Sequence, residues 1–279
     1  MTDSANEGSL PLRLRIADKW IMYLILGVTC LVFLFPLVNA FQASIQVGGL
    51  MNYWTVLTRD YNGVSIPLTF LNSGIIAAMH AAIVCVVGSL AGYAFSRIPF
   101  VGRTATYYLV LIFLAVPATA ILVPVYHITS SMQLFNSYLG VAMPEATLTL
   151  PFAVLLLKNQ IDAMPVSLME AAVMDRAGHF RIYFHVVLPL LRGPLVSLAA
   201  LSIMWSLQDF LFPATLLRNV SLTTAAQAVQ TIKGAFGPTA YENSLYYAAL
   251  MLLAVPALII IVGGFKYISR GMTNGSIKE

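Results

Sequence analysis

Six long apolar stretches, separated by polar segments, constrain the fold of this chain more than any other feature. A helix crosses the hydrocarbon core of a bilayer with about 20 apolar residues. Each stretch has roughly this length, and in chain order they cover residues 20–40, 67–95, 104–126, 139–157, 195–217 and 245–267. The pattern predicts an all-α, polytopic membrane protein with six transmembrane helices.

The composition supports this fold class and narrows the possible functions. Apolar residues make up 59% of the chain and charged residues 9%, whereas soluble domains carry roughly 25% charged residues. The basic residues are scattered at the ends of the apolar stretches, so we expect no nucleic acid partner. Cys30 and Cys85 fall inside apolar stretches without disulfide or metal spacing, and we interpret both as buried hydrophobic side chains. The sequence lacks the GxxxxGK[ST] motif of many ATP-binding subunits.

An even number of spans places both ends of a chain on the same side of the membrane. Lysine and arginine gather in the cytoplasmic segments of membrane proteins. With six spans, all but Arg59, Arg218 and Lys233 of the 15 basic residues fall on the side of the termini. We therefore expect residues 1–19 and 269–279 to be cytoplasmic tails, and residues 20–268 to form the membrane domain.

The segment between the fourth and fifth spans, residues 158–194, is the most polar long stretch outside the tails. Ser167 and Glu170 have the capping-box spacing that starts a helix, and Gly178 is placed to end this helix in a left-handed conformation. A second short helix is expected to follow and to end at Pro189. Two short amphipathic helices at a membrane surface predict a docking site for a soluble partner. The alternative is a capped helix in a solvated loop.

Glycine and proline residues predict how the spans pack and bend. Gly88 and Gly92 form a GxxxG pair, which lets a second helix approach closely, either within this chain or from another subunit. Pro117 and Pro124 interrupt the third apolar stretch, so we expect a kinked span. Broken helices are tolerated in membranes where they line a cavity or pack against protein.

Glu145 and Asp209 are the acids within the spans. An ionisable residue at the centre of a span costs about 2.5–3.5 kcal/mol on insertion scales and usually faces a cavity. Near Asp209, aromatic rings adjoin amide and carboxylate groups, a combination that suits a sugar. We take Trp205, Gln208, Asp209, Phe210 and Glu145 as candidate substrate-pathway residues. Alternatively, Asp209 ends a half-helix or pairs with a partner subunit, and Glu145 lies near the outer interface.

Three short motifs in the polar segment resemble the EAA loop of ABC importer permeases. They are Glu170-Ala171-Ala172, then Asp175, then Leu188-Pro189. In that family the loop is a cytoplasmic coupling helix that inserts into a cleft of an ATP-hydrolysing subunit. The resemblance implies that Glu170 faces the ATPase and that the two alanines permit close helix approach.

One position departs from the family pattern, which has Gly directly after the Asp. This chain has Arg176 there, so we expect the bend two residues later, at Gly178, and an additional partner contact from Arg176. The implied ATPase-coupling residues are Ser167, Glu170, Ala171, Ala172, Asp175, Arg176, Ala177 and Gly178.

Further resemblances point to the carbohydrate branch of these permeases. Residues 205–211 resemble its W-x-x-N-[DE]-F-L segment, with Gln208 in place of Asn. The turn after the second span, which contains Arg97 and Arg103, resembles the corresponding turn of that branch. Residues 270–279 resemble the R-G-[LM]-T-x-G-x-x-K-G ending of the maltose-type second permease subunit, with Glu279 in place of the last Gly.

The chain is thus identified as a member of the maltose-type second permease family of bacterial carbohydrate ABC importers. The resemblance implies an inner-membrane location, a different permease as partner, two ATPase copies that carry the ATP and Mg²⁺, an external sugar-binding protein, and no chemistry or cofactor in this chain. One rival is the same machine with glycerol phosphate or a polyamine as cargo. The other is an ion-coupled secondary transporter, for which Asp209 and Glu145 would be the candidate ion site.

Overall fold

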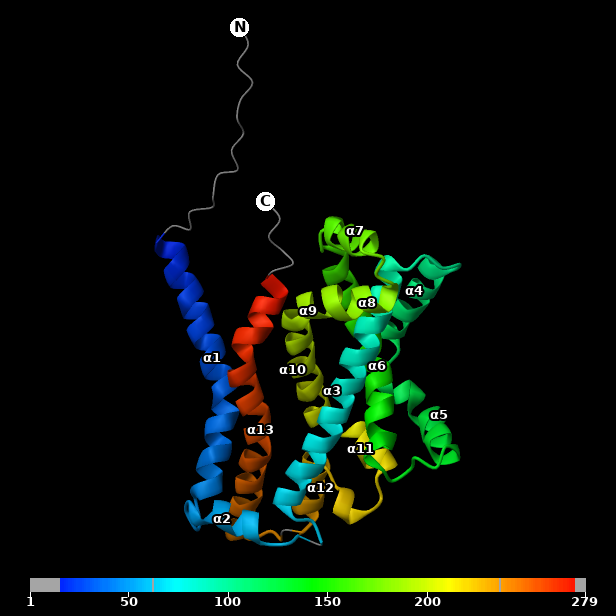
Figure 1. The fold of residues 1–279 in the computed structure, drawn as a ribbon. Helices are drawn as coiled ribbons and strands as arrows, with labels where there is room; N and C mark the ends of the chain where they lie inside the picture. The colour runs from blue at the N-terminus through cyan, green and yellow to red at the C-terminus, as the bar shows by residue number, and fades with distance from the viewer. Residues whose placement is uncertain (1–15, 62, 236, 274–279) are drawn as a thin grey trace.

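The computed structural model describes residues 16–61, 63–235 and 237–273. Within these ranges the named elements are all helices, and Tyr61 and Val64 form an isolated β-bridge. Five long helices run side by side along the molecule (Figure 1). They are α1 (Ile16–Ile45), α3 (Ile66–Arg97), α6 (Tyr138–Asp162), α10 (Arg192–Gln208) and α13 (Ala240–Thr273).

Short helices occupy the ends and one side of this bundle (Figure 1). At one end lie α2 (Met51–Thr58), α11 (Leu211–Leu216), the 3₁₀ turn η3 (Val220–Leu222) and α12 (Ala225–Ala235). Beside α6 lie α4 (Arg103–Ile112), the 3₁₀ turn η1 (Phe113–Ala115) and α5 (Ala118–Ser131). At the other end lie α7 (Val166–Met174), α8 (His179–Ile182), the π-turn η2 (Tyr183–Val187) and α9 (Leu188–Leu190).

The packing of α3 against α6 forms the centre of the largest apolar core. A Cβ built on Gly88 would lie 2.8 Å from the Cβ of Ala153, and one on Gly92 would lie 3.1 Å from the backbone nitrogen of Lys158. Leu157, between these contacts, is fully buried. The GxxxG pair therefore brings the backbones of two helices of this chain together, as the first of its two interpretations predicts.

Five of the predicted spans correspond to helices or helix pairs with the length and composition of a membrane span. Three are single helices: α1 from Trp20 onwards, α3 and α6. Two are bent pairs: α4 with η1 and α5 turn by 106°, and α10, which covers the first part of the fifth stretch, makes an angle of 74° with residues 179–190 of the predicted coupling segment. The sixth predicted stretch lies within α13.

The third apolar stretch is broken at one of its two prolines. Pro117 stands between η1 and α5 with ψ of 140°, so the chain there is extended and the direction changes. Pro124 does not interrupt the span, contrary to expectation, because it lies inside α5 and the helix continues around it. A single missing backbone hydrogen bond can be accommodated inside a membrane helix.

The fifth apolar stretch is also interrupted, as the alternative interpretation of Asp209, the end of a half-helix, predicts. Its helix α10 ends at Gln208, Asp209 is extended with ψ of 126°, and α11 begins at Leu211. Helix α12 forms in the segment between the fifth and sixth apolar stretches, and α2 forms in the segment between the first and second.

The two ends of the bundle carry different parts of the chain. The first described residues of α1, the last residues of α13 and the whole of α7 lie at one end, while α2 and α12 lie at the other (Figure 1). Helix α13 continues to Thr273, past the predicted boundary at residue 268. Most of the predicted N-terminal tail, residues 1–15, and the end of the C-terminal motif, residues 274–279, lie outside the described residues.

Candidate functional site

The predicted coupling helix exists as α7, but the capping box at its start does not. The helix begins at Val166, after Pro165, and no side chain caps it. Ser167 therefore lies inside the first turn, two residues after the N-cap position, which Pro165 occupies. Pro165 has ψ of 127°, which turns the chain into the helix without a capping side chain.

The end of α7 forms a Schellman motif, centred on a different residue from the one expected. The backbone nitrogen of Ala177 donates to the Ala172 oxygen (3.0 Å), and that of Arg176 donates to the Val173 oxygen (2.9 Å). Arg176 takes the left-handed conformation with φ of 58°. Gly178 has φ of −73° and is extended, so the prediction that it makes the bend is wrong. The pair of reciprocal bonds fixes the left-handed residue at the second position after the helix, whatever residue stands there.

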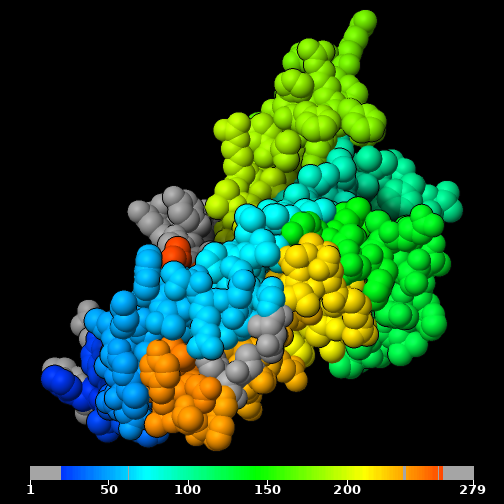
Figure 2. All heavy atoms as spheres, turned by 90° about the horizontal axis from the view of Figure 1, so that it is seen from below, coloured from blue at the N-terminus to red at the C-terminus, as the bar shows by residue number. Residues whose placement is uncertain are grey.

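Helix α7 is attached to the rest of the molecule along one face only. Met169 is buried, and Ala172 and Ala177 pack against the same apolar core. Glu170 and Ala171 are exposed, together with apolar side chains that no described residue covers: Val166, Leu168, Val173 and Met174, the last 83% exposed. The surrounding coupling segment projects past one edge of the molecule (Figure 2). A carboxylate within an exposed apolar surface is what a docking helix offers a protein groove.

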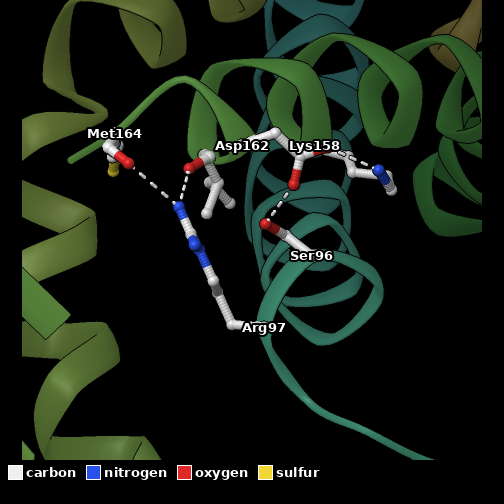
Figure 3. Close-up of polar contacts among 6 residues, drawn as sticks. Ser96, Arg97, Lys158, Asp162 and Met164 are labelled. Carbon is white, nitrogen blue, oxygen red and sulfur yellow. Dashed lines mark hydrogen bonds and ion pairs between the residues drawn. The ribbon is translucent and has the colours of Figure 1, made fainter. Parts of the chain in front are cut away.

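Polar contacts at the ends of α3 and α6 hold the start of this segment in place. Arg97 Nη2 donates to the backbone oxygens of Ile161 (2.6 Å) and Met164 (3.1 Å). These hydrogen bonds connect the end of α3 to the turn that leads into α7. Asp162 accepts from Ser96 and pairs with Lys158, both at 2.5 Å (Figure 3). The position of α7 therefore follows the ends of two core helices.

The second half of the segment packs against α3. The hydroxyl groups of Ser89 and Tyr183 share a buried hydrogen bond of 2.7 Å. The Tyr93 hydroxyl lies 3.4 Å from His179 Nδ1. The predicted second helix is present as α8, η2 and α9, but it does not end at Pro189, which lies in the first turn of α9. The π-turn before this proline widens the helix and accommodates its missing N–H.

Four of the five candidate pathway residues line one hollow of about 250 Å³. Its walls come from α3, α5, α6, α10 and α11, and its lining residues are His80, Ala118, Glu145, Leu148, Thr149, Trp205, Ser206, Gln208, Asp209 and Phe212. The fifth candidate, Phe210, is exposed and lies outside the lining of this hollow. It precedes the first turn of α11, where the change of chain direction separates it from its neighbour Asp209.

Each of the two carboxyl groups of the hollow accepts one hydrogen bond from a hydroxyl or a backbone N–H. Glu145 is 5% exposed, and its Oε2 accepts a hydrogen bond of 2.6 Å from Ser206. Asp209 Oδ1 accepts from the backbone nitrogen of Leu211 at 2.9 Å, so this side chain caps the start of α11. Glu145 Oε1 and Asp209 Oδ2 are buried, and the two carboxyl groups lie within hydrogen-bonding reach of each other. Asp209 thus ends a half-helix with one oxygen and faces the hollow region with the other, and Glu145 does not lie at an exposed interface.

His80 is a member of this site that the sequence analysis missed. It is fully buried, with Nδ1 3.0 Å from the Ser202 oxygen and Nε2 2.8 Å from Thr149 Oγ1. An ionisable residue in the middle of an apolar span is itself a signal of a functional cavity, and His80 carried that signal. Trp205 adds an aromatic wall and contacts Phe152 edge-on, with ring centroids 5.4 Å apart.

Comparison with known proteins places the chain in a family. Residues 85–274 match the family described as "Binding-protein-dependent transport system inner membrane component". The chain belongs to this family. The matched segment contains the whole of α6, α7, α10 and α13, whereas α1 and α2 precede it.

Named relatives of this permease span most of its length. The "Osmoprotective compounds uptake permease protein GgtD" of Synechocystis sp. is 30% identical over 82% of this chain and 75% of its own. The "Arabinooligosaccharides transport system permease protein AraQ" of Halalkalibacterium halodurans is 26% identical over 93% of this chain and 96% of its own. Both names describe permeases, and the AraQ name agrees with the sugar ABC permease family that the sequence motifs indicate.

A solved structure confirms the ABC permease fold. A chain of the bacterial ABC transporter "involved in the import of the acidic polysaccharide alginate" superimposes with a TM-score of 0.76 and 17% identity. The match covers 93% of this chain and 99% of that one. A second structure, described as an alginate transporter in complex with a periplasmic protein bound to an alginate pentasaccharide, gives a TM-score of 0.68 and 16% identity.

Proposed function

We propose that this permease forms one half of the translocation pathway of a bacterial sugar importer and passes the movement of a separate ATPase to that pathway. The observation that carries the proposal is the surface of α7. Helix α7 exposes four large apolar side chains and Glu170 at the end of the bundle, and its other face is fixed to the core. Exposed apolar patches rimmed by polar groups mark protein interaction sites.

The contacts behind α7 suggest how a displacement would reach the pathway. Arg97 ties the turn before α7 to α3, and Tyr183 ties the segment after it to Ser89 on the same helix. Helix α3 also carries His80, which lines the hollow. Binding and hydrolysis of ATP with Mg²⁺ would occur in the partner, and this chain would act as a two-state element whose equilibrium the partner biases.

We further propose that six spans cross the inner membrane, with both termini and α7 in the cytoplasm. The sixth span would be residues 245–267 within α13. The placement of α7 at the same end as the start of α1 and the end of α13 supports a shared side (Figure 1). The distribution of lysine and arginine supports the cytoplasm as that side.

The expected assembly contains a second, different permease, two ATPase copies and an external binding protein. The family name itself refers to binding-protein-dependent transport, and one structural relative is described in complex with a periplasmic protein. A sugar is the proposed cargo, because relatives are named for arabinooligosaccharides and lactose. The aromatic and polar lining of the hollow suits the same class of compound.

Purification of the permease from its native membrane in mild detergent tests the docking role. We expect an ATPase and a second permease to accompany the wild type, and the amount of ATPase to fall at least tenfold with Glu170→Lys. The matched control is Glu242→Lys, because Glu242 lies at the start of α13, at the end of the bundle opposite α7. Normal recovery of the ATPase with Glu170→Lys, or a wild type that purifies alone, would contradict the proposal.

A further inference from the structure

An apolar groove follows one side of α3 towards the end of the bundle that carries α7. Its wider part, about 370 Å³, lies between α3, the segment η2–α9 and α10, and its narrower part, about 170 Å³, lies between α3 and the segment α8–η2. Leu90 and Tyr183 line both parts, so the two form one continuous groove. The hydroxyl groups in its wall have partners in the same wall: that of Tyr183 bonds to Ser89, and that of Tyr93 lies 3.4 Å from His179 Nδ1. The groove therefore presents mainly apolar surface.

The groove opens on the opposite side of α3 from the hollow. Ser89, in the groove, lies nine residues after His80, which lines the hollow. An α-helix has about 3.6 residues per turn, so nine residues make two and a half turns and the two side chains point in opposite directions. In the proposed transporter the hollow belongs to the translocation pathway, and the groove on α3 accordingly faces away from that pathway.

The depth of the groove matches one leaflet of a bilayer. Along α3 it runs from Cys85 to Ile98, which is about 20 Å at a rise of roughly 1.5 Å per residue. One leaflet contributes about 15 Å of hydrocarbon. In the proposed orientation the groove begins near the bilayer centre and ends at the cytoplasmic surface, where α3 also ends. A hydrocarbon chain can cover its wall, in which several apolar side chains are about half exposed: Val86 (57%), Phe184 (54%) and Val196 (48%).

Two arginines stand at the cytoplasmic end of the groove. Arg192 starts α10, one helical turn before Leu195 of the groove wall. Arg181 lies in α8, one turn before Phe184 of the same wall. Both arginines are exposed, neither forms an ion pair within the described residues, and no carboxylate among those residues lines the groove. Basic residues at the cytoplasmic mouth of such a pocket attract anionic lipid headgroups, and the arginine fork matches a phosphate.

We infer that the groove binds an anionic phospholipid of the cytoplasmic leaflet: one acyl chain lies along α3, and Arg181 and Arg192 hold the phosphate. A transmembrane helix of the second permease would also cover the apolar wall. The two arginines at the mouth favour instead a ligand that joins an acyl chain to a negative charge. The lipid would fill the junction where the bond from Tyr183 to Ser89 joins the coupling segment to α3. The inference goes beyond the proposed function and relies on the orientation proposed with it.

Photo-labelling of the purified transporter in nanodiscs tests the inference. The probes are phosphatidylglycerol and phosphatidylcholine with the same diazirine-bearing acyl chain, each added at the same low density to a phosphatidylcholine membrane. Mass spectrometry of peptides maps the labelled residues. We expect phosphatidylglycerol to label residues 85–90 of α3 and 195–199 of α10 about fivefold more than phosphatidylcholine does. Residues 31–38 of α1, an exposed apolar stretch without lysine or arginine, should show no preference.

Variants without the two positive charges assign the preference to the mouth of the groove. Arg181→Gln with Arg192→Gln leaves the apolar wall intact and should remove the roughly fivefold preference for phosphatidylglycerol. Arg103→Gln is the control, because Arg103 starts α4, which lies beside α6 and away from the groove (Figure 1). Equal labelling by the two lipids in the wild type, no labelling of the groove, or an unchanged preference in the double variant would each overturn the inference. So would a benzoylphenylalanine at position 196 that crosslinks to the second permease.

The recovery of the ATPase separates this inference from the proposed function. A complex that retains its ATPase but gives one of these contrary results sinks the lipid site alone. Loss of the ATPase from the wild-type preparation sinks the proposed function instead. The comparison of the two lipids needs only the wild type, so it stands even if the double variant fails to fold.

Discussion

At the scale of single residues, the most informative position is Arg176. It adopts φ of 58° within a Schellman motif, a conformation that costs a residue with a Cβ roughly 1–2 kcal/mol. The EAA loop pattern has glycine at this position, which avoids that cost. The sequence pattern predicted the bend at the nearest glycine, Gly178. The structure keeps it at residue 176, because the backbone hydrogen bonds of the helix end define the geometry.

The strain at Arg176 predicts that Arg176→Gly stabilises the coupling segment. After the greater freedom of glycine in the unfolded chain is deducted, the gain is about 0.5–1 kcal/mol. Amide hydrogen exchange at residue 177, whose N–H closes the motif, should slow by roughly two- to fivefold. Gly178→Ala is the control, since Gly178 has an ordinary φ and open space around its Cβ position. Faster amide exchange at residue 177 in Arg176→Gly would contradict the backbone strain assigned to Arg176.

At the scale of elements, helices were more predictable than their interruptions. The apolar length of α3 and α6 predicted both spans to within a few residues, and Pro117 indicated one break correctly. The break at Asp209 was predicted only as one of two alternatives, because neither proline nor glycine marks it. There the Asp209 side chain caps α11, a tertiary arrangement that local propensity does not reveal. The π-turn before Pro189 escaped for the same reason.

The contents of the hollow show the same division between local and tertiary information. Glu145 and Asp209 were found from the sequence because charge is costly in an apolar span. Their convergence with His80 from α3 depends on how three helices cross. Phe210 was included as an aromatic residue of the W-x-x-N-[DE]-F-L segment, and at the start of α11 its side chain lies outside the lining of the hollow.

The close approach of α3 and α6 predicts the effect of adding a methyl group at Gly88. Its Cβ would lie 2.8 Å from that of Ala153, and overpacking of this kind costs about 1–3 kcal/mol. Gly88→Ala should therefore lower the thermal stability of the permease in detergent. Gly74→Ala is the matched control on the same helix, with nothing within 4 Å of its Cβ position; there the higher helix propensity of alanine should leave stability equal or higher. Equal effects of the two substitutions would contradict the packing role of Gly88.

At the scale of the whole molecule, the bundle has two chemically different ends and an open side. Helix α1 lies along α13, and its side chains from Trp20 to Val38 are exposed. Such a surface requires lipid or a second permease to cover it. The end with α7 exposes apolar side chains around Glu170, and the opposite end carries α2 and α12 (Figure 1). This polarity is what an importer with separate inner and outer partners requires.

The proposed orientation predicts which end can be reached from outside the cell. Two single-cysteine variants are compared, Trp54→Cys on α2 and Met174→Cys on α7. In both, Cys30 and Cys85 are replaced by alanine. A membrane-impermeant maleimide should label Trp54→Cys in intact spheroplasts. It should label Met174→Cys only in opened membranes from which peripheral proteins have been stripped. The reverse pattern would place α7 outside and exclude its docking to a cytoplasmic ATPase.

The measurement that tests the central claim most directly is photo-crosslinking from the exposed face of α7. A benzoylphenylalanine replaces Met174, which is 83% exposed, and in a parallel strain it replaces Trp54 at the other end of the bundle. We expect ultraviolet light to join the permease to a protein with a Walker A motif from position 174 only, and Glu170→Lys to abolish this adduct. An adduct with that protein from position 54, or none from position 174 in a complex that retains its ATPase, would contradict the account.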